Sequence, residues 1–169
     1  MKRSLFVFAA VLGVFEIFAF DSAKWLVRRE AMTKDAERLR AAYSNAVGRI
    51  DSPSEGITIP FELFPDGSVR TSIYAEKAQI YQKSPLIWAE GLTLIRYDDE
   101  GKEKHRLEAG SCIIDRMSKS GWVEGHAKVT QGKTSFEGDG VYFSSSNNFV
   151  SAYSKSDIRS EDLRFGGLK

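Results

Sequence analysis

The sequence predicts an all-β domain of stacked antiparallel strand pairs, preceded by an N-terminal transmembrane and stalk helix. From residue 57 onward, short runs of alternating apolar and polar residues are separated by turn-forming stretches such as "PDG", "QKSP" and "SSSNN". One pattern of apolar positions recurs three times in this part of the chain. Eleven Phe, six Tyr and three Trp among 169 residues also favour strands.

Composition excludes several classes of function. A hydrophobic fraction of 42% and a charged fraction of 28% are typical of a globular domain. The formal net charge of +1 gives no electrostatic basis for general nucleic-acid binding, so we expect no nucleic-acid partner. A single cysteine excludes an internal disulfide, and with two histidines it provides too few ligands for a classical zinc site. We therefore expect neither a metal nor a cofactor.

The N-terminal segment has the layout of an export signal. Lys2 and Arg3 precede an apolar run over residues 5–20, which extends through Val27 to a length sufficient to cross the roughly 30 Å hydrocarbon core. Residues that suit signal cleavage are poorly placed, so we interpret residues 1–27 as an uncleaved signal anchor, with a cleaved signal as the alternative. Glu16 interrupts this run. A carboxylate at membrane depth is costly, which makes Glu16 a candidate contact for a partner within the membrane.

Residues 28–56 predict an amphipathic helical stalk and a linker. Apolar residues recur every three or four positions and form a stripe along one helical face, comprising Met32, Ala36, Leu39, Tyr43, Ala46 and Ile50. The stretch "DSPSEG" over 51–56 ends the helix, because it contains a proline and a glycine. The β domain is then expected over residues 57–169.

The repeat is clearest in two nearly identical words, "WAEG" from Trp88 and "WVEG" from Trp122. When three segments are aligned on Ala75, Ala109 and Gly138, apolar character recurs at the same offsets before and after these positions. Each unit is interpreted as two strands joined by a turn, with one apolar side facing a shared interior. Within each unit the inward-facing phase reverses once, which predicts a bulge or bend. The glycines that end the two words are candidates for such bends, and they exclude a helical tetratricopeptide repeat.

No motif predicts catalysis. "AKVTQGKT" over 127–134 resembles a loosened phosphate-binding loop, but a strand-like stretch follows it where that loop requires a helix. His105 and His126 have no partners at catalytic spacing, and Glu90 and Glu124 are expected on separate, outward-facing strands. We therefore expect a binding or structural protein that is not an enzyme.

The order of these features resembles a known family. The pattern "A..A.I", then "W.EG", then "FEGDGVYFSSSNNFVSA" is similar to the OstA-like β-jellyroll domains of the lipopolysaccharide export machinery. The resemblance covers roughly residues 57–165. With the N-terminal anchor included, the chain resembles the LptC-like periplasmic components of that machinery.

The resemblance implies a single-pass inner-membrane protein whose β domain lies in the periplasm. Such a protein would receive lipopolysaccharide from the subunits of an inner-membrane ABC exporter. It would pass the lipid along an apolar groove that continues into another OstA-like jellyroll by edge-strand addition. The residues expected to line the groove are Ile73, Ala75, Ala78, Ile80, Trp88, Ile95, Leu107, Ala109, Cys112, Ile114, Trp122, Val129, Phe136, Val141 and Phe143.

Three alternatives remain open at this point. The same side chains could fill a closed sandwich that has no groove. With its signal cleaved, the chain would be a soluble, LptA-like lipopolysaccharide shuttle. A pilin-like subunit also combines an apolar N-terminal helix with a β domain, although here no Gly or Ala precedes a long apolar stretch with a Glu five residues on.

Overall fold

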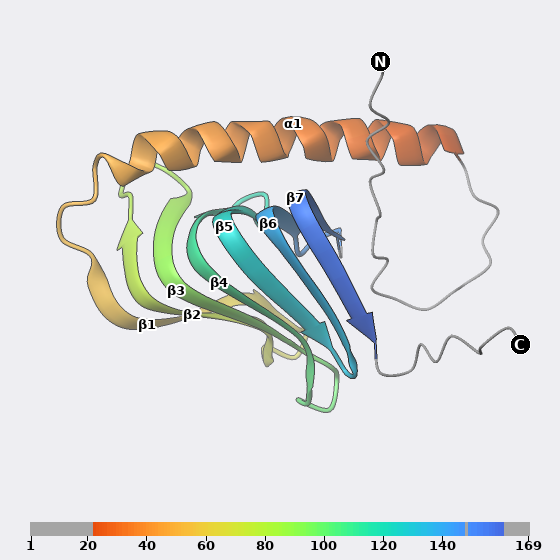
Figure 1. Ribbon diagram of the computed structural model, residues 1–169. Helices are drawn as coiled ribbons and strands as arrows, with labels where there is room; N and C mark the ends of the chain where they lie inside the picture. The colour runs from red at the N-terminus through yellow and green to blue at the C-terminus, as the bar shows by residue number, and fades with distance from the viewer. Residues whose placement is uncertain (1–21, 148, 161–169) are drawn as a thin grey trace, which may run out of the picture.

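In the computed structural model, residues 22–147 and 149–160 form one helix and one antiparallel sheet (Figure 1). The helix is α1 (Ser22–Val47). The strands are β1 (Ser54–Leu63), β2 (Val69–Ile80), β3 (Leu86–Tyr97), β4 (Glu103–Asp115), β5 (Ser120–Gln131), β6 (Thr134–Ser144) and β7 (Phe149–Ser160). Each strand pairs with the next along the chain, so the sheet order is β1 to β7. The all-β prediction and the predicted turns are confirmed, and β1 begins three residues before the expected start.

The strands bend where the repeat predicted a change of phase. In β3, Ala89 and Leu92 both belong to the same buried cluster although they are three residues apart, and Gly91 between them has a φ of +62°. In β5, Val123 pairs with Val141 while His126 pairs with Asp139, so β5 contains one extra residue at this point. These bends let the sheet curve strongly, as Figure 1 shows.

The curved sheet folds over so that its two halves face each other across an apolar interior. Glu62, near the end of β1, accepts a 2.7 Å hydrogen bond from Ser145 in the turn after β6. These two positions lie at opposite ends of an antiparallel meander, so the contact requires the two halves of the sheet to face each other. Between the halves lies the inner cluster, whose buried members are Ile73, Ala75, Ala78, Ile87, Ala89, Leu92, Leu94, Leu107, Cys112, Ile114, Val123, Ala127, Val129, Phe136, Val141 and Phe143.

Helix α1 covers part of the opposite, outer face of the sheet (Figure 1). A row of large side chains crosses β3 to β6 there, because Trp88 pairs with Ile113, Ile113 with Trp122, and Trp122 with Tyr142. The helix packs its apolar stripe on this row, and together they form the outer cluster of Met32, Ala36, Leu39, Ala46, Trp88, Ile113, Trp122 and Tyr142. The predicted stripe is confirmed. The segment expected to be a stalk is thus packed along the sheet and shares a core with it.

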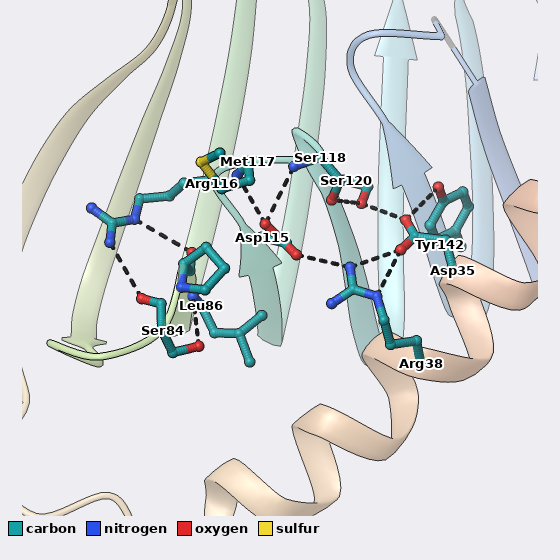
Figure 2. Close-up of polar contacts among 11 residues, drawn as sticks. Asp35, Arg38, Ser84, Leu86, Asp115, Arg116, Met117, Ser118, Ser120 and Tyr142 are labelled. Carbon is teal, nitrogen blue, oxygen red and sulfur yellow. Dashed lines mark hydrogen bonds and ion pairs between the residues drawn. The ribbon is translucent and has the colours of Figure 1, made fainter.

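A polar network fixes the helix to the sheet, as Figure 2 shows. The Asp35 carboxylate accepts hydrogen bonds from the hydroxyls of Ser120 at 2.6 Å and Tyr142 at 3.0 Å. Arg38 donates both to Asp35, at 2.7 Å, and to Asp115 of β4, at 2.8 Å. Burial raises the pKa of Asp35, but the hydrogen bonds from Ser120, Arg38 and Tyr142 outweigh burial and hold the pKa below its usual value. The carboxylate is therefore the form that joins helix and sheet.

Residues 1–21 of the expected anchor, which include Glu16, lie outside the described residues, and residues 22–27 form the start of α1. Within the part of the chain that the structure describes, no helix is long and apolar enough to cross a membrane.

Asp35→Asn should lower the free energy of unfolding by about 1–3 kcal/mol, because it removes the charge that three donors share. The loss of unfolding free energy relative to the wild type should have its full size above about pH 4, the usual pKa of an unfolded aspartate. It should shrink as the pH falls through the lower pKa of Asp35 in the folded protein. Urea unfolding at several pH values measures both effects.

Glu30→Gln is the matched control, because Glu30 lies on the solvent-exposed side of the same helix and pairs only with exposed Lys34 among the described contacts. Its unfolding should match that of the wild type. Equal stability of Asp35→Asn and Glu30→Gln at neutral pH would show that the network does not hold the helix in place.

Candidate functional site in the interior of the sheet

The structure brings most of the predicted groove residues together in the interior. The inner cluster contains Ile73, Ala75, Ala78, Leu107, Cys112, Ile114, Val129, Phe136, Val141 and Phe143, with Ala109 packed against it. They come from β2, β4, β5 and β6, and the bends place both halves of these strands on the same enclosed side. That these residues line a path for lipid stays a prediction.

Four of the predicted residues lie elsewhere. Trp88 and Trp122 point to the outer face and belong to the outer cluster under α1. Ile95 follows inward-facing Leu94 in β3, so strand alternation places Ile95 on the outer face. Ile80 is 46% exposed at the end of β2. The apolar pattern was ambiguous because both faces of this sheet are buried over part of its area.

Sequence reasoning missed interior residues in β3 and β5. Ile87 and Ala89 flank Trp88 and point inward, as does Val123 next to Trp122. Leu92, Leu94 and Ala127 complete this part of the inner cluster. Their signal was present in the sequence, since the neighbours of an outward-facing Trp in a strand must face inward. To use this signal, one must first know which face of the sheet each Trp occupies.

Over its central part, the interior is closely filled by side chains. Cys112, Ile114, Val123 and Val141 have no exposed surface. The Phe143 ring passes directly over Gly121 of β5, where an added Cβ would clash with the ring atoms. Burial raises the pKa of the Cys112 thiol to about 12, so the thiol stays protonated and unreactive at neutral pH.

A pocket opens where the two halves of the sheet meet near the β6–β7 turn. It encloses about 500 Å³, including the space open to solvent at its mouth. One wall comes from β3, β4 and β5 and the other from the end of β6 and the start of β7. The lining residues are Leu94, Arg96, His105, Arg106, Leu107, Val129, Phe143, Ser144, Ser145, Phe149 and Val150.

A row of polar residues crosses the sheet at the mouth of this pocket. Glu62, Thr71, Arg96 and His105 are successive register partners on β1 to β4. Thr71 donates to Glu62 at 2.8 Å, and Arg96 donates to the main-chain oxygen of Ser145 at 3.4 Å. With the Glu62–Ser145 bond, these contacts hold the mouth of the interior together.

Lys119, in the turn after β4, adds an ion pair to Glu62 with an N–O separation of 3.7 Å. Burial raises the pKa of Glu62, but hydrogen bonds from Ser145 and Thr71 and the charges of Lys119 and Arg96 keep the pKa below its usual value. Glu62 is therefore an ionised carboxylate on which both halves of the sheet converge.

His105 and Arg96 lie in surroundings that disfavour positive charge. The Nδ1 atom of His105 is buried and has no hydrogen-bond partner among the described residues. Burial, followed by the charges of Lys104 and Arg96, lowers the pKa of His105 to about 4, so its ring is neutral at neutral pH. Burial, followed by the charge of Arg70, also lowers the pKa of Arg96.

Residues 22–147 and 149–160 contain no group of three or more His, Cys, Asp or Glu side chains that could hold a metal ion. The arrangement offers an apolar interior, a pocket at its mouth and a polar rim, which are features of a binding site.

The chain has a weak structural likeness to a known protein. No family model matches the chain, and no curated protein matches its sequence. Among solved structures, the fold is similar to LptH of Pseudomonas aeruginosa, described as the LptA-homologous periplasmic component of the conserved lipopolysaccharide transport device. The match has a TM-score of 0.34 and 13% sequence identity, and covers 63% of this chain and 92% of LptH. At this TM-score the likeness supports no conclusion about fold or function.

Gly121→Ala tests how closely the interior is packed. Because the new methyl group must displace the Phe143 ring, the substitution should lower the free energy of unfolding by about 1–3 kcal/mol. Gly110→Ala is the matched control, since nothing lies within 4 Å of a Cβ at that position of β4. Chemical unfolding measures the free energy of unfolding of both variants. Equal values would contradict close packing of Phe143 on Gly121.

Proposed function

We propose that this chain is a non-enzymatic lipid-binding component of lipopolysaccharide transport, built on an OstA-like β-jellyroll. The observation that carries the proposal is the apolar interior between the two halves of the bent sheet, which widens into a pocket at its mouth. The repeated strand pairs that build this interior are the ones on which the family resemblance rests.

The energetics of the pocket suit an acyl chain. Leu94, Leu107, Val129, Phe143 and Val150 give it apolar walls. Each methylene moved from water into such surroundings gains about 0.8 kcal/mol, so about ten methylenes would gain about 8 kcal/mol. That gain exceeds the net value of about 1 kcal/mol for a typical hydrogen bond, and only a few such bonds close the mouth. Lipid entry can therefore break these hydrogen bonds at the mouth of the pocket.

A bridge between membranes also requires an edge that another protein can extend. Among the described residues, β1 pairs only with β2 and β7 only with β6, so each leaves one edge open. β1 contains Pro60, which has no main-chain N–H to donate. β7 contains neither proline nor glycine over its 12 residues. We therefore assign β7 as the edge that receives the strand of a second OstA-like jellyroll.

We further propose the LptC-like arrangement, in which residues 1–27 anchor the chain in the inner membrane beside the subunits of an ABC exporter. Because α1 lies along the outer face of the sheet, the β domain would sit next to the anchor and not at the end of a stalk. A cleaved, LptA-like shuttle is the alternative. Retention in the membrane fraction after a carbonate wash supports the anchored form, and release would support the shuttle.

Photo-crosslinking in living cells tests the proposed ligand. Replacing Phe143 with photoreactive p-benzoyl-phenylalanine places the probe in the pocket, because the Phe143 ring lines it. Illumination should give adducts that react with antibodies to lipopolysaccharide. The cells must be of a species that makes this lipid and exports the protein.

Tyr74 is the matched control position, because it is an aromatic residue on β2 that is 44% exposed. The same probe at Tyr74 should give no lipid adduct. Absence of adducts at Phe143 in a folded, exported protein would favour a closed sandwich. Equal yields at both positions would show only general contact with lipid.

A further inference from the structure

The mouth of the pocket combines apolar walls with two nitrogen-bearing side chains that lie side by side. Arg96 of β3 and His105 of β4 are register partners, and both line the pocket. Leu94 and Leu107, two residues away on the same strands, also line it. An occupant that enters with its chain between the leucines therefore has its end at Arg96 and His105.

Positive charge predominates at this end of the pocket. The charges of Arg70 and Lys104 act on Arg96 and His105 respectively, while the nearby carboxylate of Glu62 is shared by Ser145, Thr71, Lys119 and Arg96 itself. A negatively charged group placed here would offset the repulsion between these cations. It would also give the buried Nδ1 of His105 a hydrogen-bond partner.

We propose that this pocket binds a phosphate-bearing acyl lipid, with the chain against Leu94, Leu107 and Val129 and the phosphate on Arg96 and His105. The inference rests on the proposed lipid-binding function and adds the chemical class of the group that is recognised. The guanidinium of Arg96 presents a planar fork that matches phosphate oxygens. The apolar walls suit an acyl chain and not a free phosphate ion.

The two histidines make the inference measurable in the full chain. His105 lies in the pocket, whereas His126 is exposed on β5 beside Asp139. The protein, with isotope-labelled histidine, is held in dodecyl maltoside micelles, which contain no phosphate. Dodecyl phosphate, dodecylglycerol and inorganic phosphate are titrated separately while the histidine NMR signals are followed.

Dodecyl phosphate should shift the His105 signals saturably and leave those of His126 unchanged. Its negative charge favours the imidazolium form, so the pKa of His105 should rise from about 4. Dodecylglycerol has the same chain without the charge and should bind at least about tenfold more weakly. Saturation of the His105 signals by inorganic phosphate alone would mean that the site binds free phosphate. Equal binding of dodecylglycerol would mean that the pocket does not recognise the negative charge. Either result overturns the proposal.

Arg96→Gln should weaken dodecyl phosphate binding about tenfold or more and leave dodecylglycerol unaffected, since one charge-assisted hydrogen bond is lost. Arg96→Lys should restore part of the preference. Arg159→Gln is the matched control, because Arg159 is an exposed residue at the end of β7 and does not line the pocket. Unchanged binding by folded Arg96→Gln overturns the proposal. Should that variant not fold, His105→Gln with a fluorescence binding assay provides the same test.

This test can fail independently of the proposed function. Lipopolysaccharide adducts at position 143 without a preference for phosphate would support transport and reject the role of Arg96 and His105. A phosphate preference without such adducts would support the site and assign it to a different lipid.

Discussion

The bend within the strands is the constraint on which the rest of this structure depends. A straight seven-stranded meander would expose one of its apolar faces along its whole length. Here the alternation of inward and outward side chains shifts by one residue in the middle of a strand, as at Gly91 between Ala89 and Leu92. The two halves of the sheet can then face each other and bury a common cluster without a second sheet. The same bend creates the mouth, because the free ends of the two halves meet there through Glu62 and Ser145.

The outer face shows how the helix becomes part of the domain. Trp88, Ile113, Trp122 and Tyr142 form an apolar row that would otherwise lie in water, and α1 covers it with a stripe of matching spacing. The hydroxyls of Ser120 and Tyr142 lie within this contact, and both donate hydrogen bonds to the Asp35 carboxylate. A helix whose first residues belong to the expected anchor therefore also fixes the orientation of the sheet. In the proposed bridge, this would set where the pocket lies relative to the membrane.

Much of the fold could be predicted from the sequence, since each element leaves a local signal. Turn residues marked the strand ends, the spacing of Met32 to Ile50 marked the buried face of the helix, and the repeat marked the bends. The face that each Trp occupies could not be predicted, because an apolar residue is equally favourable on either side of a sheet that is buried on both. The polar row of Glu62, Thr71, Arg96 and His105 was also missed. Its members come from four strands, and only the register between those strands places them together.

The central claim is that the space between the two halves of the sheet holds lipid. Native mass spectrometry of the full chain, gently extracted from a bacterium that makes lipopolysaccharide, tests this most directly. The account predicts a population heavier by one lipopolysaccharide molecule, which Gly110→Ala should retain and which Val150→Asp, at a partly exposed position of the pocket lining, should lose while staying exported and folded. Only the mass of the bare polypeptide, under conditions that keep lipid on a known lipid-binding protein, would contradict it. The inner cluster would then be the core of a closed sandwich.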